Sequence, residues 1–302
     1  MTIKPKLMIT GANGFTGIHA CDYFKNAGYE IIAVSRTFSK SASSKGIDLE
    51  YCDLTNRHQV NDLIQKTKPD ILLHLAGQNH VQKSWEDPIT SFEANVMSTV
   101  FLVDAIRKVN INCKVIIVGS VLQFDIGEIS SLLHPYSLSK TIQVLVAQSW
   151  ELLYGMTIMI AKPTNLIGPG VSNGVCSILA KKVSEMELKN ADKVLVVNNL
   201  FAQRDFIDVR DVIRAYEVIF KVGESGLVYD ISSGHPRYLK EITDTLKTLS
   251  NVDFTIQTME DTIENINIIT SSKVLFDAGW NPLIPFEKSM EDLLHYHRDQ
   301  IL

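Results

Sequence analysis

The sequence predicts an α/β fold with a doubly wound parallel sheet, and two observations support this prediction. In the first half of the chain, short apolar runs rich in β-branched residues alternate with longer amphipathic stretches, as in repeated βα units. The first apolar run also leads into a glycine-rich turn and then an amphipathic stretch, in the order strand, turn, helix. With 302 residues, of which 45% are hydrophobic, the chain can bury a large core.

The expected elements of the main sheet follow one another in order. The apolar runs predict strands, which we place at Lys6–Thr10, Glu30–Ser35, Leu49–Cys52, Ile71–Leu75, Lys114–Gly119 and Met156–Ala161. The stretches with helical periodicity predict helices, which we place at Phe15–Ala27, Arg57–Thr67, Pro88–Val109 and Tyr136–Tyr154. In such a sheet, ligands bind outside the carboxyl ends of the strands.

The character of the sequence changes after Pro163, where the elements become shorter and the turns more frequent. We expect residues 1–163 to form the domain with the main sheet and residues 164–302 to form mainly a smaller α/β lobe. Segments near 205–232 are expected to return to the main sheet, with a helix near Val209–Lys221 and a strand at Leu227–Ile231.

Charge, cysteine usage and the start of the chain limit the expected partners. The net charge is −5 and no run of Lys or Arg occurs, so neither nucleic acid nor an anionic membrane surface is expected as a partner. The four cysteines form no CxxC pair and have no metal-ligand spacing, which predicts reduced thiols and no metal site. The start is not expected to be a signal peptide, and no other segment is expected to be long enough to cross a bilayer. We therefore expect a cytoplasmic protein that binds a small molecule.

The turn after the first strand is the candidate dinucleotide site. Its residues allow close approach of a pyrophosphate to the backbone and to a helix N-terminus; they are Gly11, Asn13, Gly14, Phe15, Thr16 and Gly17. The alternative is a glycine-rich turn without a ligand. Because the turn has the required strand and helix on either side, we predict that residues 1–163 form a dinucleotide-binding Rossmann domain.

The end of the second expected strand bears on the choice of cofactor. Neither Asp nor Glu stands where an acidic side chain would bind the adenosine ribose hydroxyls, whereas Ser35 and Arg36 are suited to a 2′-phosphate. NADP(H) is therefore preferred, with NAD(H) possible. The alternative for Arg36 is an ordinary exposed surface residue.

The ends of the third and fourth expected strands supply further candidates. Asp53, followed by Leu54, stands where a carboxylate would meet the adenine amino group, although it would equally serve as a helix cap. The small residues of the segment Leu75-Ala76-Gly77 would let the backbone run along the cofactor. His74 before them is interpreted as a core histidine.

A Tyr and a Lys four residues apart are the candidate catalytic pair. Tyr136 and Lys140 lie on one face of an expected helix, where the ammonium would favour the phenolate. A phenol tuned in this way exchanges a proton with a carbinol or ketone oxygen. Such a pair also occurs by chance on exposed helices, but here it follows a dinucleotide turn.

Taken together, these motifs resemble the extended short-chain dehydrogenase/reductase family (NAD-dependent epimerase/dehydratase type), over nearly the whole chain. The matching pieces are the glycine turn, Asp53-Leu54, His74-Leu75-Ala76-Gly77, Asn95, Ser120, Tyr136-x-x-Ser139-Lys140, residues 163–170 and residues 204–212. Residues 76–88, residues 204–212 and Gly279-Trp280-Asn281-Pro282 look like the GDP-mannose 4,6-dehydratase and GDP-4-keto-6-deoxymannose reductase branch.

The resemblance implies roles for the catalytic residues. Ser120 would hydrogen-bond the reacting oxygen of the substrate, and Tyr136 would exchange a proton with it. Lys140 would hold the nicotinamide ribose and tune Tyr136, and Asn95 would support the proton relay. Tyr136, Lys140 and Pro163 would also contact the cofactor.

The resemblance also implies a substrate, a nucleoside-diphosphate sugar held mainly by residues 164–302. Gln78, Ser120, Asn165 and Arg204 are the expected contacts, with Arg204 offering its guanidinium to a diphosphate oxygen. The alternative for Arg204 is a local ion pair with Asp205. No arginine occurs near residues 258–265, where relatives often have one, so the base of the nucleotide stays open.

The resemblance also narrows the reaction. Dehydratases of the family have an acidic residue two places after the Ser or Thr, and this chain has Leu122 there, which leaves no evident general acid for elimination. We expect NADPH-dependent reduction of a nucleoside-diphosphate 4-keto-6-deoxyhexose. The alternatives are a nucleotide-sugar epimerase with retained NAD and a redox-inactive dinucleotide-binding protein. A homodimer is expected, since relatives pair the helices that carry Asn95 and Tyr136.

Overall fold

The computed structural model describes residues 4–37, 46–188, 192–260 and 272–301, and the chain separates into two units. The first unit consists of Met1–Pro163 and Ala215–Tyr229. The second consists of Thr164–Arg214 and Asp230–Leu302. The chain therefore crosses between the units more than once.

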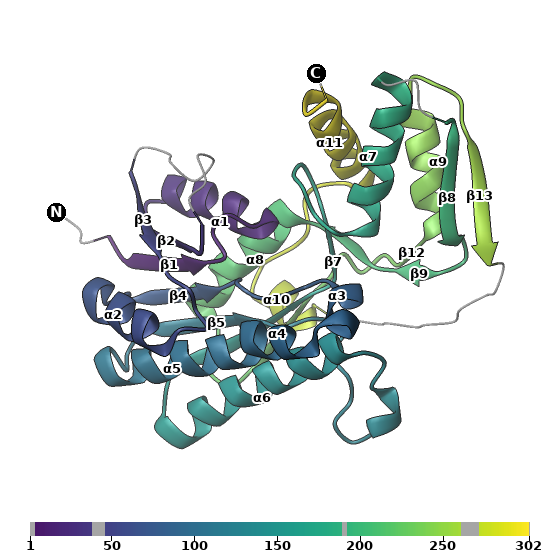
Figure 1. Ribbon diagram of the computed structural model, residues 1–302. Coiled ribbons are helices and arrows are strands. Elements are labelled where there is room, and N and C mark those ends of the chain that lie inside the picture. The colour runs from purple at the N-terminus through teal and green to yellow at the C-terminus, as the bar shows by residue number, and fades with distance from the viewer. Residues whose placement is uncertain (1–3, 38–45, 189–191, 261–271, 302) are drawn as a thin grey trace. The chain divides into compact units, whose positions relative to one another are not determined.

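A seven-stranded sheet forms the centre of the fold, in the order β11-β6-β5-β4-β1-β2-β3 (Figure 1). Its strands are β1 (Lys6–Thr10), β2 (Glu30–Ser35), β3 (Ile47–Tyr51), β4 (Ile71–His74), β5 (Lys114–Val118), β6 (Ile158–Pro163) and β11 (Val228–Ile231). Strands β1 to β6 pair in parallel. The chain runs outward from β1 to β3 and then returns to β4 on the other side of β1, so the doubly wound prediction is confirmed.

Strand positions agree closely with the pattern of apolar residues. Strands β1 and β2 begin and end where predicted, while β3 begins two residues before Leu49. Ile47 pairs with Ile31 at the start of the register between β2 and β3. The polar side chain of Asp48 interrupts the apolar run, which is why the pattern alone places the strand start too late.

Helices cover both faces of this sheet. They are α1 (Phe15–Asn26), α2 (Arg57–Thr67), α3 (Val81–Glu86), α4 (Pro88–Phe92), α5 (Ser98–Val109), α6 (Pro135–Tyr154) and α8 (Val209–Val222). Helices α2, α5 and α6 lie beside one another along one face (Figure 1). On the other face, α1 contacts α8 through the rings of Phe24 and Phe220, whose centroids are 5.6 Å apart.

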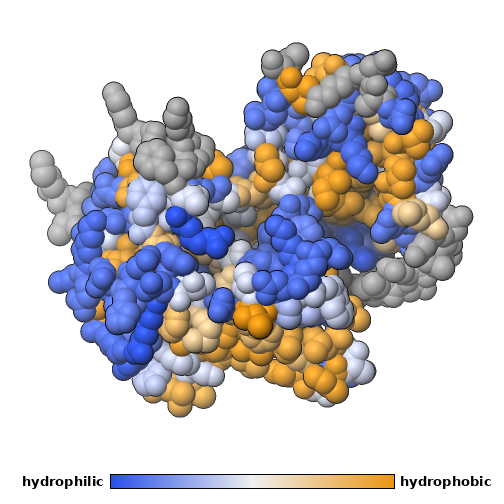
Figure 2. Space-filling view, in the orientation of Figure 1, coloured by the Kyte–Doolittle hydropathy of each residue, from blue (hydrophilic) through white to orange (hydrophobic). Residues whose placement is uncertain are grey.

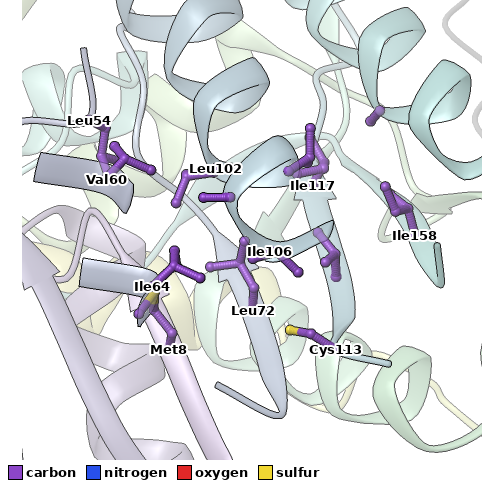
Figure 3. Packing of buried hydrophobic residues seen from close by; sticks show 14 of the residues in the cluster. Met8, Leu54, Val60, Ile64, Leu72, Leu102, Ile106, Cys113, Ile117 and Ile158 are labelled. Carbon is purple, nitrogen blue, oxygen red and sulfur yellow. The ribbon is translucent and has the colours of Figure 1, made fainter. Parts of the chain in front are cut away.

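The core between the sheet and α2 and α5 is continuous and apolar. Met8 and Leu72 project from neighbouring strands toward Ile64 of α2 and Ile106 of α5 (Figure 3). All four side chains are fully buried. Because side chains alternate between the faces of a strand, Leu7 and Ile9 pack on the opposite face, where they are equally buried.

The single helix predicted at 88–109 is continuous but not uniform. It consists of α4, a π-helical turn at Glu93–Met97 and α5, and the short helix α3 before it was not predicted. Contrary to the prediction, the segment Pro88–Val109 is long and apolar enough to cross a bilayer by length and composition, but half of its apolar window is buried in the fold. The cytoplasmic location stays a prediction.

The second unit has its own core. It contains three strand pairs, β7 (Asn165–Ile167) with β10 (Phe206–Asp208), β8 (Val194–Asn199) with β13 (Thr255–Glu260), and β9 (Gln203–Arg204) with β12 (Arg237–Tyr238). Its remaining helices are α7 (Val175–Leu188), α9 (Leu239–Leu249), α10 (Lys273–Asp277) and α11 (Phe286–Asp299). Apolar residues of α7, α9 and α11 pack together against the strands.

Candidate active site

The glycine turn joins β1 to α1 at the carboxyl edge of the sheet. Gly11 has a φ of +68°, and the backbone N–H of Gly14 donates to its carbonyl oxygen at 2.9 Å. A Cβ atom at residue 17 would lie 2.2 Å from that same oxygen, so only glycine fits there. The close turn places the start of α1 directly after the strand, and Gly14 provides no side chain to cap it.

The surroundings of the turn fit a dinucleotide. A Cβ atom at residue 14 would meet only the Gly11 carbonyl oxygen, at 3.1 Å, so the space in front of the helix N-terminus is otherwise open. The uncapped N–H groups of the first helical turn are donors for phosphate oxygens. Oδ1 of Asn13 is buried without a hydrogen-bond partner, an acceptor that a ribose hydroxyl would satisfy. Phe15 and Thr16 form the start of α1.

The residues predicted to select the cofactor lie beside this turn. The carbonyl oxygen of Thr37 accepts hydrogen bonds from Nδ2 of Asn13 and Oγ of Ser35, both at 2.9 Å. Arg36, which lies between Ser35 and Thr37 in the sequence, is exposed. The structure thus brings Ser35 and Arg36 next to the glycine turn, as a site for the adenosine end of the cofactor requires.

Asp53 stabilises its own loop. Its Oδ1 accepts from the backbone and the hydroxyl of Thr55 at 3.0 and 2.8 Å. The N-cap of α2 is Asn56 instead, whose side chain accepts from His58 and Gln59. Leu54 is buried in the core of the first unit.

The segment after β4 connects the turn to the catalytic residues. The backbone N–H of Ala76 donates to Oγ1 of Thr10 at 3.2 Å, and a Cβ atom at residue 11 would lie 2.9 Å from this nitrogen. A Cβ atom at residue 77 would lie 2.6 Å from Oδ1 of Asn95. Leu75 and the small residues after it therefore pass between the glycine turn and Asn95.

Tyr136 lies in the first turn of α6, which begins with Pro135 and is capped by Nδ1 of His134. Its side chain is buried, which raises the pKa of its phenol, while a side-chain hydrogen bond with Ser120 lowers it. Burial is the larger effect. The structure therefore favours the protonated phenol at neutral pH, where the sequence predicted that the ammonium of Lys140 would favour phenolate.

Lys140 lies one helical turn after Tyr136 and is buried as well. Burial lowers the pKa of its ammonium to about 7. Its Nζ donates to the carbonyl oxygen of Val118 at 2.6 Å and to Oε1 of Gln143. Gln143 was not predicted; its signal in the sequence is an amide within the apolar run of α6, three residues after Lys140.

Asn95 connects the π-helical turn to α6. Its Nδ2 donates to Oγ of Ser139 at 2.9 Å and to the carbonyl oxygen of Gln78 at 3.0 Å, and its Oδ1 accepts from the backbone N–H of Gln78 at 2.8 Å. The side chain of Gln78 bonds to the backbone of His80 in its own loop and to the hydroxyl of Ser91 in α4. Its predicted role as a substrate contact stays a prediction.

Ser120 follows β5 and faces the same site. Its Oγ accepts from the backbone N–H of Leu122 at 3.1 Å, and its own N–H donates to Oε1 of Gln123 at 3.2 Å. The structure therefore brings together Ser120, Tyr136, Lys140 and Asn95, all in the first unit.

The other predicted contacts lie at or after the end of β6. Pro163 is its last residue and is buried. The side-chain amide of Asn165 donates to the backbone carbonyl oxygen of Asp205 at 2.9 Å. The guanidinium of Arg204 donates to the backbone carbonyl oxygen of Gln203 at 2.7 Å. The buried carboxylate of Asp205 accepts from Thr164, Ser233 and His235. It thereby connects the residues next to Asn165 of β7 and Arg204 of β9 with the segment at Ser233, all in the second unit.

Residues 261–265 of the segment near 258–265 lie outside the described residues. Among the described residues, no three side chains of His, Cys, Asp or Glu are grouped to hold a metal ion.

A doubly wound sheet with a glycine turn at its switch point, and a Ser, Tyr and Lys grouped beside that turn, define an NAD(P)-dependent oxidoreductase of the short-chain dehydrogenase/reductase type. The chain belongs to the NAD dependent epimerase/dehydratase family, which it matches over residues 7–232.

Individual relatives match along nearly the whole chain. GDP-6-deoxy-D-mannose reductase of Pseudomonas aeruginosa is 26% identical, over 96% of each chain. The human dTDP-D-glucose 4,6-dehydratase is 24% identical, over 97% of this chain and 90% of that one.

The solved structure of RMD from Pseudomonas aeruginosa, complexed with NADPH, has a TM-score of 0.83 at 25% identity, over 98% of this chain and 100% of that one. UDP-glucose 4-epimerase of Thermus thermophilus, in complex with NAD, also has a TM-score of 0.83, at 20% identity over 97% and 99%. A nicotinamide dinucleotide is thus the cofactor that these relatives support.

Proposed function

We propose that this protein is an NADPH-dependent reductase of a nucleoside-diphosphate 4-keto-6-deoxyhexose. The observation that carries the proposal is the grouping of Ser120 and Tyr136 beside the glycine turn, with an apolar residue, Leu122, where a dehydratase of this family has an acid. The match to GDP-6-deoxy-D-mannose reductase along 96% of the chain supports the same reaction.

In this proposal, each residue of the site has a defined task. NADPH, when bound at the glycine turn, would supply a hydride for the ketone carbon of the sugar. Tyr136, which burial keeps protonated, donates its proton to the ketone oxygen, and Ser120 hydrogen-bonds the same oxygen. Lys140 provides a positive charge that stabilises the phenolate left on Tyr136. Asn95 holds the loop at Gln78 against α6 and so maintains the geometry.

Dehydration is disfavoured by the residue at position 122. Elimination of the sugar hydroxyl requires a group that protonates it as it leaves. The backbone N–H of Leu122 bonds to Oγ of Ser120, so residue 122 lies directly beside the reaction centre, and its side chain has no proton to give. Hydride transfer remains as the chemistry that the site supports.

The preference for NADPH over NADH rests on Ser35 and Arg36. Their loop is joined to the glycine turn through Thr37, and it offers a hydroxyl and a guanidinium in place of a carboxylate. A carboxylate there would repel the 2′-phosphate, whereas a guanidinium binds it. The substrate contacts that we propose in the second unit are Asn165 and Arg204.

The test is an assay of the purified protein with NADPH or NADH and a panel of nucleoside-diphosphate 4-keto-6-deoxysugars, in which absorbance of the reduced nicotinamide is followed. We expect oxidation of NADPH with one member of the panel, reduced at least about 100-fold in Tyr136→Phe, which removes the proton donor. Bound NADPH, measured by fluorescence, should be retained in this variant. Absence of turnover across the panel, together with NAD that copurifies with the protein, would instead identify a nucleotide-sugar epimerase.

A further inference from the structure

A chain of buried polar side chains runs behind the reaction centre, from β1 to α6. Oγ1 of Thr10 lies 2.8 Å from Nδ1 of His74, and Nε2 of His74 lies 2.9 Å from Oγ1 of Thr99. Nε2 of Gln143 donates to the same Thr99 oxygen at 2.8 Å, and Oε1 of Gln143 accepts from Nζ of Lys140. Except for Lys140, which is slightly exposed, these side chains are at most 1% exposed.

The direction of each hydrogen bond follows from the number of protons available. Thr99 has one hydroxyl proton, and it donates this proton to the carbonyl oxygen of Asn95 at 2.8 Å, an atom that only accepts. Nε2 of His74 must therefore carry the proton and donate to Thr99. Nδ1 of His74 then accepts from Thr10, whose oxygen in turn accepts the backbone N–H of Ala76. Burial and the charge of Lys140 lower the pKa of His74 to about 3, so the ring is neutral, as this assignment requires.

The same count of available protons fixes the orientation of the side-chain amide of Gln143. If the amide were rotated by 180°, its oxygen would face Thr99, which has no proton left, and its NH₂ group would face the Lys140 ammonium, which only donates. The side-chain oxygen of Gln143 is therefore directed at Lys140. The end of the amide at Thr99 is sufficient to fix this orientation, because the one hydroxyl proton of Thr99 is donated to the carbonyl oxygen of Asn95.

We propose that Gln143 is a positioning residue that holds the ammonium of Lys140 at the reaction centre through its side-chain oxygen, and that Thr99 sets the orientation of that oxygen. The inference deepens the proposed function and rests on it only in giving Lys140 a part in the reaction. Thr10 directly precedes Gly11 in the sequence. The row of hydrogen-bonded side chains from Thr10 to Lys140 therefore also connects the strand that enters the dinucleotide turn with the catalytic lysine.

The ionisable groups that face Lys140 are few. His74 approaches from β4 and is neutral, and Tyr136 precedes it by one turn on α6. Its two protein acceptors, the oxygens of Val118 and Gln143, are uncharged. Since burial alone lowers the pKa of Lys140, an acceptor such as Gln143 opposes this effect by stabilising the charged form.

The direct test measures the protonation of Lys140 without substrate or cofactor. The ¹⁵N chemical shift of lysine Nζ is followed by NMR as a function of pH, with the Lys140 signal identified by its loss in Lys140→Met. We expect the pKa of Lys140 to fall by about 1 in Gln143→Met, which keeps the shape but removes the acceptor. Thr99→Val, which leaves the amide of Gln143 free to rotate, should shift it in the same direction. Gln143→Glu should raise it.

The matched control is Gln148→Met, the same substitution at a half-buried position of α6, which should leave the titration of Lys140 unchanged. An unaltered titration in both Gln143→Met and Thr99→Val would overturn the proposal, even if both variants lost stability. If Gln143→Met does not fold, Thr99→Val and Gln143→Glu still decide the question.

Where the assay finds a substrate, Gln143→Met should lower kcat more than it raises KM. Failure of the reductase assay leaves the titration result intact, so the two proposals fail separately.

Discussion

At the scale of single residues, burial acts in opposite directions on the two ionisable groups of the site. It raises the pKa of Tyr136 and lowers that of Lys140 to about 7, because it disfavours phenolate and ammonium alike. A protonated phenol is the form that a reductase needs at the start of its reaction, since it must give a proton away. The hydrogen bond from Ser120 lowers the pKa of Tyr136 and so moderates the effect of burial.

The pKa of Lys140 predicts the pH dependence of turnover. As the pH rises through about 7, Lys140 loses its charge and no longer stabilises the phenolate formed on Tyr136. We therefore expect kcat/KM for ketone reduction to fall above pH 7, by about tenfold per pH unit once the lysine is neutral. The measurement is the pH profile of NADPH oxidation. A flat profile from pH 6 to pH 9 would contradict the assignment of a charged Lys140 to the reaction.

His74 predicts a pH dependence of stability. Its pKa is about 3 in the folded protein and 6.5 in the unfolded chain, so between these values the unfolded chain binds the extra proton. The free energy of unfolding should therefore fall by about 1.4 kcal/mol for each pH unit of acidification in this window. Urea unfolding of the native protein and of His74→Gln, at several pH values from 6.5 downward, tests this. The variant should lose less stability on acidification, and equal slopes would count against a neutral buried His74.

At the scale of elements, the turn between β1 and α1 shows two different uses of glycine. Residue 17 must be glycine for packing, because a Cβ atom would lie 2.2 Å from the Gly11 carbonyl oxygen. Residue 14 has a φ of −78°, which any residue adopts, and a Cβ atom there would meet one atom, at 3.1 Å. Packing therefore requires glycine less strictly at residue 14 than at residue 17, and we expect glycine there to serve the approach of a ligand.

This difference predicts that Gly17→Ala and Gly14→Ala have separate effects. Gly17→Ala should destabilise the fold by about 3 kcal/mol, because the backbone must move to remove the overlap. Gly14→Ala should change stability by less than about 1 kcal/mol but weaken NADPH binding at least about tenfold, since its methyl group occupies the space in front of the helix N-terminus. Thermal unfolding and fluorescence titration with NADPH measure the two quantities. A stable Gly14→Ala variant with unaltered affinity would place the diphosphate elsewhere.

The elements also show how far the sequence alone determines the fold and the site. Apolar runs, helical periodicity and the glycine turn are local signals, and they predicted β1, β2 and α2, while the spacing of Tyr136 and Lys140 predicted that both lie on one helix. The π-helical turn at Glu93–Met97 has no local signal, because the backbone there accommodates the bonds of Asn95 to Gln78 and Ser139. Gln143 was missed because an amide in an apolar helical run does not identify its partner, and Thr99 is 44 residues away in the chain.

At the scale of the whole molecule, the first unit carries exposed apolar residues that its own fold does not cover. Figure 2 shows apolar residues gathered along the lower edge, over α6 and the loop before it. In the described part of the chain they include Leu152 and Leu153 of α6, and Ile129 and Leu133 of the loop, all of them exposed. Exposed apolar residues gathered in this way are typical of a protein–protein interface.

We infer that this surface joins two copies of the chain into a homodimer. Ser149 and Leu153 are exposed and lie one turn apart on α6, so arginines at both positions would place two charges on the surface without disturbing the core. Light scattering of the native protein at micromolar concentration should give the mass of a dimer, and that of the variant Ser149→Arg with Leu153→Arg the mass of a monomer. Val171→Arg, at an equally exposed apolar residue of the second unit, is the matched control and should remain dimeric. A monomeric native protein would refute the inference, and a dimeric double variant would place the interface on another face.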